Sequence, residues 1–349
     1  MSRTRVFATS LVLSLTLGRV APAQQHEHES AGRVVFHTSC APAAQRSFER
    51  GVTLLHSFWY EPAEDAFSAA VAADSSCAMG YWGKAMSLLH PLWTPPAPDP
   101  AAGLAAAQRG LALARTPRER DYLGAIHAYY KDYATLDHRA RLIGYAQAMD
   151  GVQRRNPADR EAAIFYALAL IALGQANTTD TTFAYQRRAD SILEPIFKAE
   201  PEHPGLAHYL IHANDVPQLA EYGLYAARRY AAIAPDVPHA QHMPSHIFTR
   251  LGFWDEDIAS NSRSAAAARA FETERHLTAL WDQRGTPGTT SCTRTCRRDG
   301  MPRRSDWWTR RRASRRFTRP GRSPTNTRSP RSPRAMRSSA VAGRTQRVS

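Results

Sequence analysis

Residues 202–254 read EHPGLAHYLIHANDVPQLAEYGLYAARRYAAIAPDVPHAQHMPSHIFTRLGFW. They contain six of the fourteen histidines of the chain. Two of these are four residues apart, and three more are spaced by three and then four residues: His208 and His212, then His239, His242 and His246. Side chains at such spacings share one face of an α-helix. The stretch also divides at prolines and glycines into helix-length pieces that end in tight turns, which is typical of helical-repeat proteins.

The chain begins with the features of a secretory signal peptide. Arg3 and Arg5 precede an apolar run at 6–17, and the small-residue site Ala21-Pro22-Ala23 follows. This pattern predicts cleavage after Ala23 and export to the periplasm or the medium. The apolar run is too short to span a bilayer, and no later segment is long and apolar enough to do so. We expect residues 24–42 to form an N-terminal extension.

The positive net charge of the chain is confined to residues 285–349. This segment holds eighteen of the 45 basic residues and two of the 31 acidic ones, which gives it +16 and leaves −2 for the rest. A basic tail rich in Ser, Pro and Thr is typical of a disordered arm that binds nucleic acid, but this tail contains no lysine. GC-rich DNA translated out of frame yields such a composition, and successive stretches of the tail can be recoded in one shifted frame into alanine-rich helical sequence. We therefore expect a frameshift near Arg284, a disordered tail and no nucleic-acid partner.

Residues 43–284 are predicted to form one all-α domain. Ala, Leu, Arg and Glu dominate, alternation of β-branched residues is nearly absent, and turn signals recur every ~12–20 residues. Thr116 and Glu119 form a capping-box pattern around Pro117. The predicted helices are 43–58, 61–73, 77–90, 101–115, 117–133, 137–154, 159–174, 183–199, 204–213, 217–233, 239–251 and 255–271. We expect them to stack as antiparallel hairpins in an α-solenoid.

The first hairpin resembles the tetratricopeptide repeat. When Ala44 is taken as position one of a ~34-residue unit, small and aromatic residues stand where two antiparallel helices touch: Gly51, Ala63, Phe67 and Ala70. Later units fit more loosely, and in the last one Asn261 and Ser264 stand where an aromatic residue and an alanine are expected.

The chain also resembles a group of exported bacterial repeat proteins. The shared phrases are C-A-M-x-Y-W-G at 77–83, H-P-G-L-A-H-Y-L-I-H-A at 203–213 and H-M-P-S-H-I-F-x-R-L-G-x-W at 242–254. The resemblance implies a helical-repeat architecture, and it implies no enzymatic activity.

The histidines admit three interpretations. Neutral imidazole is a good ligand for zinc, and i, i+4 pairs chelate a metal from one helical face. The candidate ligands are His208, His212, His239, His242, His246 and Asp215, the last as a ligand or as a partner that orients one. Against a metal, no H-E-x-x-H motif is present. The other interpretations are a structural network, in which residues such as His203 bond turn carbonyls, and a catalytic site.

If the two histidine-bearing helices pack side by side, four of the rings face one polar pocket, and His239 lies at its rim. Four buried imidazoles without acids, water or metal would leave polar atoms unpaired at a cost of about 1–3 kcal/mol each. Such a pocket therefore needs a carboxylate, a water network or a metal ion, and Asp215 and Asn214 are the nearest candidates.

Cys40 and Cys77 precede and follow the first predicted hairpin, so both lie at the same end of it. In an exported protein this placement predicts a disulfide, and two buried thiols are the alternative.

Two function classes follow from the sequence. The first is an interaction scaffold whose concave groove binds a protein or peptide partner. The second is a metal- or small-ligand-binding protein, a hydrolase included, that uses the histidines of residues 203–246. No phosphate loop, G-x-S-x-G elbow or dinucleotide fingerprint occurs in residues 24–284, so the sequence favours the scaffold.

Overall fold

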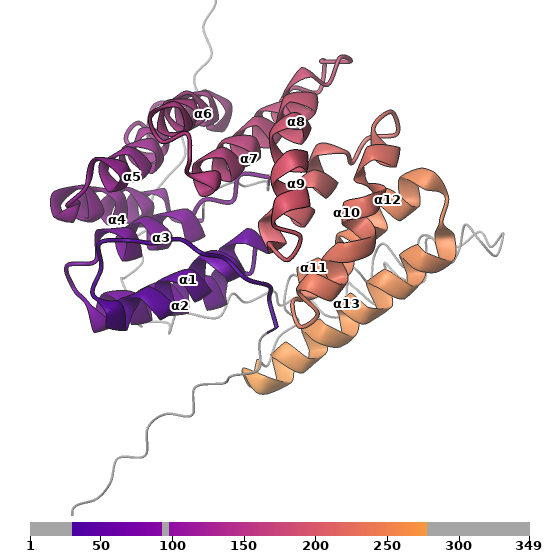
Figure 1. Cartoon of the computed structure of the whole chain (residues 1–349), viewed down its shortest axis with the longest axis horizontal. Helices are drawn as coiled ribbons and strands as arrows, with labels where there is room; N and C mark the ends of the chain where they lie inside the picture. The colour runs from indigo at the N-terminus through magenta and orange to yellow at the C-terminus, as the bar shows by residue number, and fades with distance from the viewer. Residues whose placement is uncertain (1–29, 93–97, 278–349) are drawn as a thin grey trace, which may run out of the picture.

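The computed structural model of this chain describes residues 30–92 and 98–277. Within them the fold is all-α, as predicted, with no strand (Figure 1). The helices are α1 Pro42–His56, α2 Tyr60–Ala73, α3 Ala78–Ser87, α4 Pro100–Leu113, α5 Pro117–Tyr130, α6 His138–Arg155, α7 Arg160–Ala176, α8 Ala184–Ala199, α9 Pro204–Ala213, α10 Ala220–Ile233, α11 Pro238–His242, α12 Pro244–Leu251 and α13 Trp254–Glu274. The predicted signal peptide, the expected frameshift near Arg284 and the basic tail lie outside the described residues. No described helix combines the length and apolar character needed to cross a bilayer.

Capping residues set the starts of the middle helices. Asp99, Asp137 and Asp159 each accept a hydrogen bond from the backbone N–H three residues later. Thr116 and Glu119 form the predicted capping box at the start of α5. The starts of α4 to α7 therefore fall within one residue of the predicted positions.

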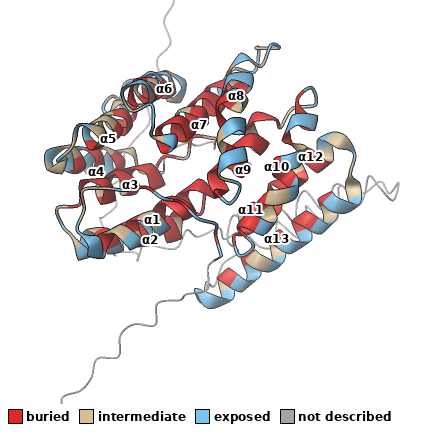
Figure 2. Cartoon of the chain, in the orientation of Figure 1, coloured by how far each residue is buried: buried red, intermediate tan, exposed pale blue. Residues whose placement is uncertain are grey.

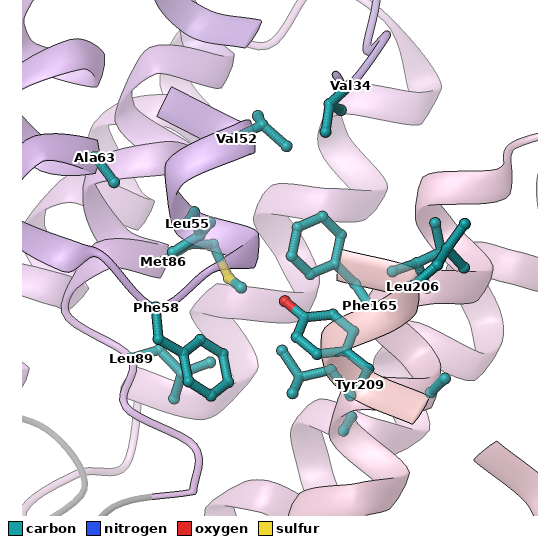
Figure 3. Packing of buried hydrophobic residues seen from close by; sticks show 14 of the residues in the cluster. Val34, Val52, Leu55, Phe58, Ala63, Met86, Leu89, Phe165, Leu206 and Tyr209 are labelled. Atoms are coloured by element: carbon teal, nitrogen blue, oxygen red, sulfur yellow. The ribbon is translucent and has the colours of Figure 1, made fainter. Parts of the chain in front are cut away.

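Each helix packs against the next one in the chain, and some helices also touch the next but one, as α3 touches α5 and α7 touches α9. Figure 2 shows the buried residues along the inward faces of the helices. Four rings at the centre of the first half are fully buried and contact one another: Phe36, Phe48, Trp82 and Tyr122. Figure 3 shows the neighbouring part of this core around Phe165 and Tyr209.

The end of α1 contacts helices that follow much later in the chain. The carbonyl of His56 accepts from His208 Nδ1 at 2.6 Å across 152 residues of sequence. The Tyr230 hydroxyl donates to Ser57 at 3.0 Å across 173 residues. Helix α1 also packs directly on α9. The first hairpin therefore lies against the helices that carry the histidines.

Residues 30–41 form an irregular strap that crosses the helix array. At one end, the Arg33 N–H donates to the Glu202 carbonyl at 3.3 Å, and Gly32 adopts a φ of +90° close to Pro204. At the other end, the ring of Phe36 enters the aromatic core. The expected N-terminal extension is therefore a packed part of the fold from residue 30 onward, although it lacks the helical periodicity that predicts packing.

The single helix expected over residues 239–251 is wrong, because the structure divides it into α11 and α12. Pro244 lacks the N–H that would continue the helix, and α12 begins at this residue. The helix expected from residue 217 begins at Ala220.

Helix α13 buries a polar stripe, which explains where its sequence departs from the repeat pattern. Ser260 Oγ donates to the Gln241 carbonyl, and Ser264 Oγ donates to the Pro238 carbonyl at 2.7 Å. Both carbonyls belong to α11, whose five residues are too few to pair their own backbone groups. Polar residues at these α13 positions therefore hold α11 in place.

Cys40 and Cys77 form a disulfide that ties the end of the strap to the start of α3, with Cα atoms 4.6 Å apart.

Candidate metal site

Three helices bring the predicted histidines together. Helix α9 carries His208 and His212, α11 carries His239 and His242, and α12 carries His246. The His208 ring centroid lies 4.8 Å from those of His212 and His239, and the His242 and His246 centroids are 4.9 Å apart. The two sets of rings are also in contact: the ring centroids of His239 and His242 are 6.1 Å apart, and those of His212 and His246 are 6.4 Å apart. These five residues are called the histidine cluster below.

His239 is half-buried, as a residue at the rim would be, and it also contacts the other rings of the cluster. Its Nε2 is 3.0 Å from Nε2 of His208. Met243, the residue between α11 and α12, keeps helical dihedral angles (φ −55°, ψ −37°), and His239 reaches His208 from α11.

In three of the five rings, Nδ1 is bonded to a fixed acceptor outside the cluster. His208 Nδ1 donates to the His56 carbonyl, His242 Nδ1 to Asn261 Oδ1 at 2.7 Å, and His246 Nδ1 to Asp215 Oδ2 at 2.7 Å. The Asn261 amide orientation is determined, because its Nδ2 donates to the carbonyl and carboxylate of Asp257 at 3.0 and 2.7 Å. In each neutral ring the proton is therefore on Nδ1, and Nε2 carries a lone pair that points into the cluster.

His212 has no hydrogen-bond partner in the structure. Both of its ring nitrogens are buried and unpaired. One nitrogen each from His208, His212 and His239 lie within 4.8 Å of one another. A tetrahedral zinc ion at its usual Zn–N distances needs ligand nitrogens about 3.3 Å apart, so small side-chain movements would complete such a geometry.

Burial keeps these three rings neutral. Desolvation is the main cause that holds the pKa of His208, His212 and His239 well below the ordinary histidine value, and neighbouring imidazoles lower it further. Neutral imidazole is the form that binds metals.

Asp215 lies behind His246 and orients its ring through a hydrogen bond. Burial tends to raise its pKa, but the hydrogen bond from His246 and the positive charge of Arg250 outweigh burial and lower the pKa. A carboxylate behind a ligating histidine fixes the ring and increases its basicity. The His246 side chain is 31% exposed, so the cluster reaches solvent on this side.

Phe58 packs against three rings of the cluster. Its ring contacts those of His208, His212 and His239 at centroid distances of 4.4, 5.7 and 5.6 Å. The residue is buried and has a φ of +53°, a conformation that disfavours a bulky side chain. The turn between α1 and α2 thus places an apolar ring against the imidazoles.

His56, Glu161 and His203 form a second group in which every polar atom is paired. Glu161 is 4% exposed and accepts from His56 Nε2 at 2.9 Å and from His203 Nε2 at 2.8 Å. The other nitrogen of His56 is 3.0 Å from the Tyr209 hydroxyl, and that of His203 accepts from the Leu206 N–H. His203 therefore caps α9 and does not bond a turn carbonyl as expected. Although its atoms are close enough for a metal, this group is complete as a hydrogen-bond network.

The sequence stretch that holds the histidines does not contain all residues of the site. His56, Phe58, Glu161 and Asn261 come from α1, the following turn, α7 and α13. For Asn261 the sequence did contain a clue, because a polar residue stands there at a position where the repeat pattern expects an aromatic one. The others carry no spacing pattern that connects them with residues 203–246.

Comparison with models of protein families finds no match, and comparison with curated proteins finds none either.

Proposed function

We propose that this protein binds a divalent transition metal ion, zinc or a similar borderline cation, through His208, His212 and His239. The observation that carries the proposal is His212, whose two buried ring nitrogens have no partner beside two further imidazole nitrogens. Each unpaired buried nitrogen costs about 1–3 kcal/mol. A metal ion supplies the partner that the protein does not.

The pattern of hydrogen bonds supports a metal over a structural network. Histidines that bind metals donate their other N–H to a carbonyl, an amide or a carboxylate, and His208 does so to the His56 carbonyl. The group around Glu161 shows the contrast, since there each imidazole nitrogen has a protein partner. Three imidazoles also leave a fourth zinc position for water or a small ligand, as in catalytic zinc sites.

Metal analysis of the purified protein without a histidine tag tests this proposal. After incubation with Zn²⁺ and dialysis we expect at least one tightly bound ion per chain. His212→Ala should weaken binding of this ion roughly 100-fold or more. His37→Ala is the matched control, because His37 is exposed and lies outside the cluster. A wild-type protein without zinc, or equal affinity in the wild type and His212→Ala, would contradict the proposal.

A second candidate function is that of a tetratricopeptide-repeat-like scaffold that binds a protein or peptide. The observation in its favour is a groove of about 1120 Å³ between the strap and the starts of α5 and α7. Val35, 54% exposed, lies along it, and charged residues of both signs line it, among them Arg118 and Glu119. An extended peptide fits a groove of this kind.

A displayed peptide library selected on the purified protein tests the groove. Val35→Asp should abolish binding of the selected peptides. Tyr222→Asp, at an exposed position outside the groove, should leave it intact. Peptides that bind both variants equally would exclude the groove as their site.

Export is part of the proposal. The disulfide between Cys40 and Cys77 supports it, since disulfides persist in oxidising compartments. N-terminal sequencing of the protein recovered from the periplasm or medium should give a chain that begins after Ala23. Recovery of the uncleaved chain from the cytoplasm alone would contradict it.

A further inference from the structure

The histidine cluster contains a second pair of imidazoles that the proposed three-histidine site does not use. His242 Nε2 and His246 Nε2 are 3.0 Å apart. The Nδ1 of each ring already donates, to Asn261 and to Asp215 respectively. In the neutral rings, two lone pairs therefore point at each other.

This contact differs from the one between His208 and His239. There His239 can donate an Nε2–H to the lone pair of His208, so the two neutral rings are compatible at 3.0 Å. Between His242 and His246 no such choice of tautomer exists, because Asn261 and Asp215 offer only acceptor oxygens to the two Nδ1 atoms. Two ring nitrogens at 3.0 Å, each with its Nδ1 held by an outer oxygen, are held together by a shared proton or by a metal ion.

We propose that Nε2 of His242 and Nε2 of His246 hold a second divalent metal ion beside the first, so that the cluster is a two-metal centre. This inference rests on the proposed function for the first ion. The i, i+4 spacing lets both rings reach one ion from the same side of the chain. Asp215 and Asn261 act as the outer partners that fix the two rings.

The second ion has two protein ligands and open positions for water or an oxygen-donor ligand. His246 lies at the solvent-reached side of the cluster, so these positions face solvent. Three imidazoles bind the first ion and two bind the second, so the second ion is the weaker of the two. A chelator should therefore remove the ion at His242 and His246 before the ion at the three-histidine site.

Metal stoichiometry and affinity in the full chain test the inference. We expect two Zn²⁺ or Co²⁺ ions per wild-type chain and one per His246→Ala chain, with a tight first ion in both. Asp215→Asn retains an acceptor for His246 Nδ1 but removes the charge. It should lower the affinity for the second ion about 10–100-fold and leave the affinity for the first ion unchanged. His212→Ala should show the reverse, a weakened first ion. Circular dichroism verifies that each variant is folded, and His246 is partly exposed, so its replacement leaves no sealed cavity.

The outcomes separate the two proposals. If the wild-type chain binds one ion, and the affinity for it is unchanged in His246→Ala but lower in His212→Ala, the proposal of a second ion is wrong and the proposal of the first ion stands. One ion weakened by both variants means a single shared ion, which also overturns the two-metal centre. No bound ion in any variant removes the proposed function itself, and the pair then shares a proton.

Discussion

Replacement of Gly83 by alanine should destabilise the protein, because the ring of Phe67 fills the space beside it. A Cβ at Gly83 would lie 2.2 Å from Cδ1 and 2.4 Å from Cε1 of this ring. Carbon atoms pack at about 3.5–4.0 Å, so the overlap is at least about 1.3 Å. The same ring also packs closely against Gly51, where a Cβ would lie 2.6 Å from Cε1, so its freedom to move is limited.

The expected magnitude follows from two opposing effects. Overpacking of a closed core costs typically about 1–3 kcal/mol, and the limited freedom of the ring favours the upper half of this range. Alanine stabilises a helix over glycine by about 0.5–1 kcal/mol. The net loss for Gly83→Ala is therefore about 1–2 kcal/mol, a decrease in Tm of roughly 2–8 °C for a domain of this size.

Thermal unfolding followed by circular dichroism measures this effect, and Gly124→Ala is the control. Gly124 is also inside a helix, but a Cβ there would meet no atom within 4 Å. Its replacement should raise the Tm by a few degrees, from a gain of about 0.5–1 kcal/mol. A Gly83→Ala protein as stable as the wild type would refute the packing of Phe67 against the two glycines.

Three further predictions concern the strap, the α5 cap and the second histidine group. Removal of the disulfide by Cys40→Ser with Cys77→Ser should cost about 3–4 kcal/mol in the chain-entropy model, measured by denaturant unfolding against wild type; an unchanged midpoint would contradict the expectation. Burial tends to raise the pKa of Glu119, but hydrogen bonds from backbone N–H groups, Ser39 among them, lower it overall. Because the folded pKa is lowered, the stabilisation is present above the unfolded carboxyl pKa of about 4.3 and is lost as the pH falls below it. Glu119→Gln should therefore cost about 1–2 kcal/mol at pH 7 and reduce the loss of stability on acidification; parallel pH profiles for the two proteins would contradict this. Glu161→Gln should lower stability by about 1.5–3 kcal/mol with metal content unchanged, and a loss of bound metal would show that the second group is part of the metal site.

The helices were predictable because their signals are local. Prolines and capping residues act within one turn, and the starts of α4 to α7 follow from them. The i, i+4 spacing also predicted that the histidines of residues 204–213 and 239–251 face one pocket, on the assumption that two helices pack side by side, although residues 239–251 were expected to form one helix. The break at Pro244 has a local signal too, because a proline inside a helix removes a hydrogen bond.

The rest of the site depends on contacts between distant residues. His56 and Phe58 reach the cluster only because α1 packs on α9, and nothing in their local sequence indicates this. Glu161 is a single acid in an alanine-rich helix, so its role becomes apparent only when His56 and His203 lie beside it. The strap was predicted as an extension because it buries side chains without regular spacing.

The contacts between α1 and α9 have a consequence for how the protein unfolds. In an open stack of repeats each unit touches only its neighbours, so the stability is approximately a sum over single units and the interfaces between neighbours. Here the strap reaches Glu202 and Ser57 reaches Tyr230, which joins the beginning of the described chain to its last third. The high sequence separation of these contacts raises the contact order, which slows folding. It also couples both halves into one cooperative transition, so removal of one terminal hairpin should destabilise helices at the other end of the sequence.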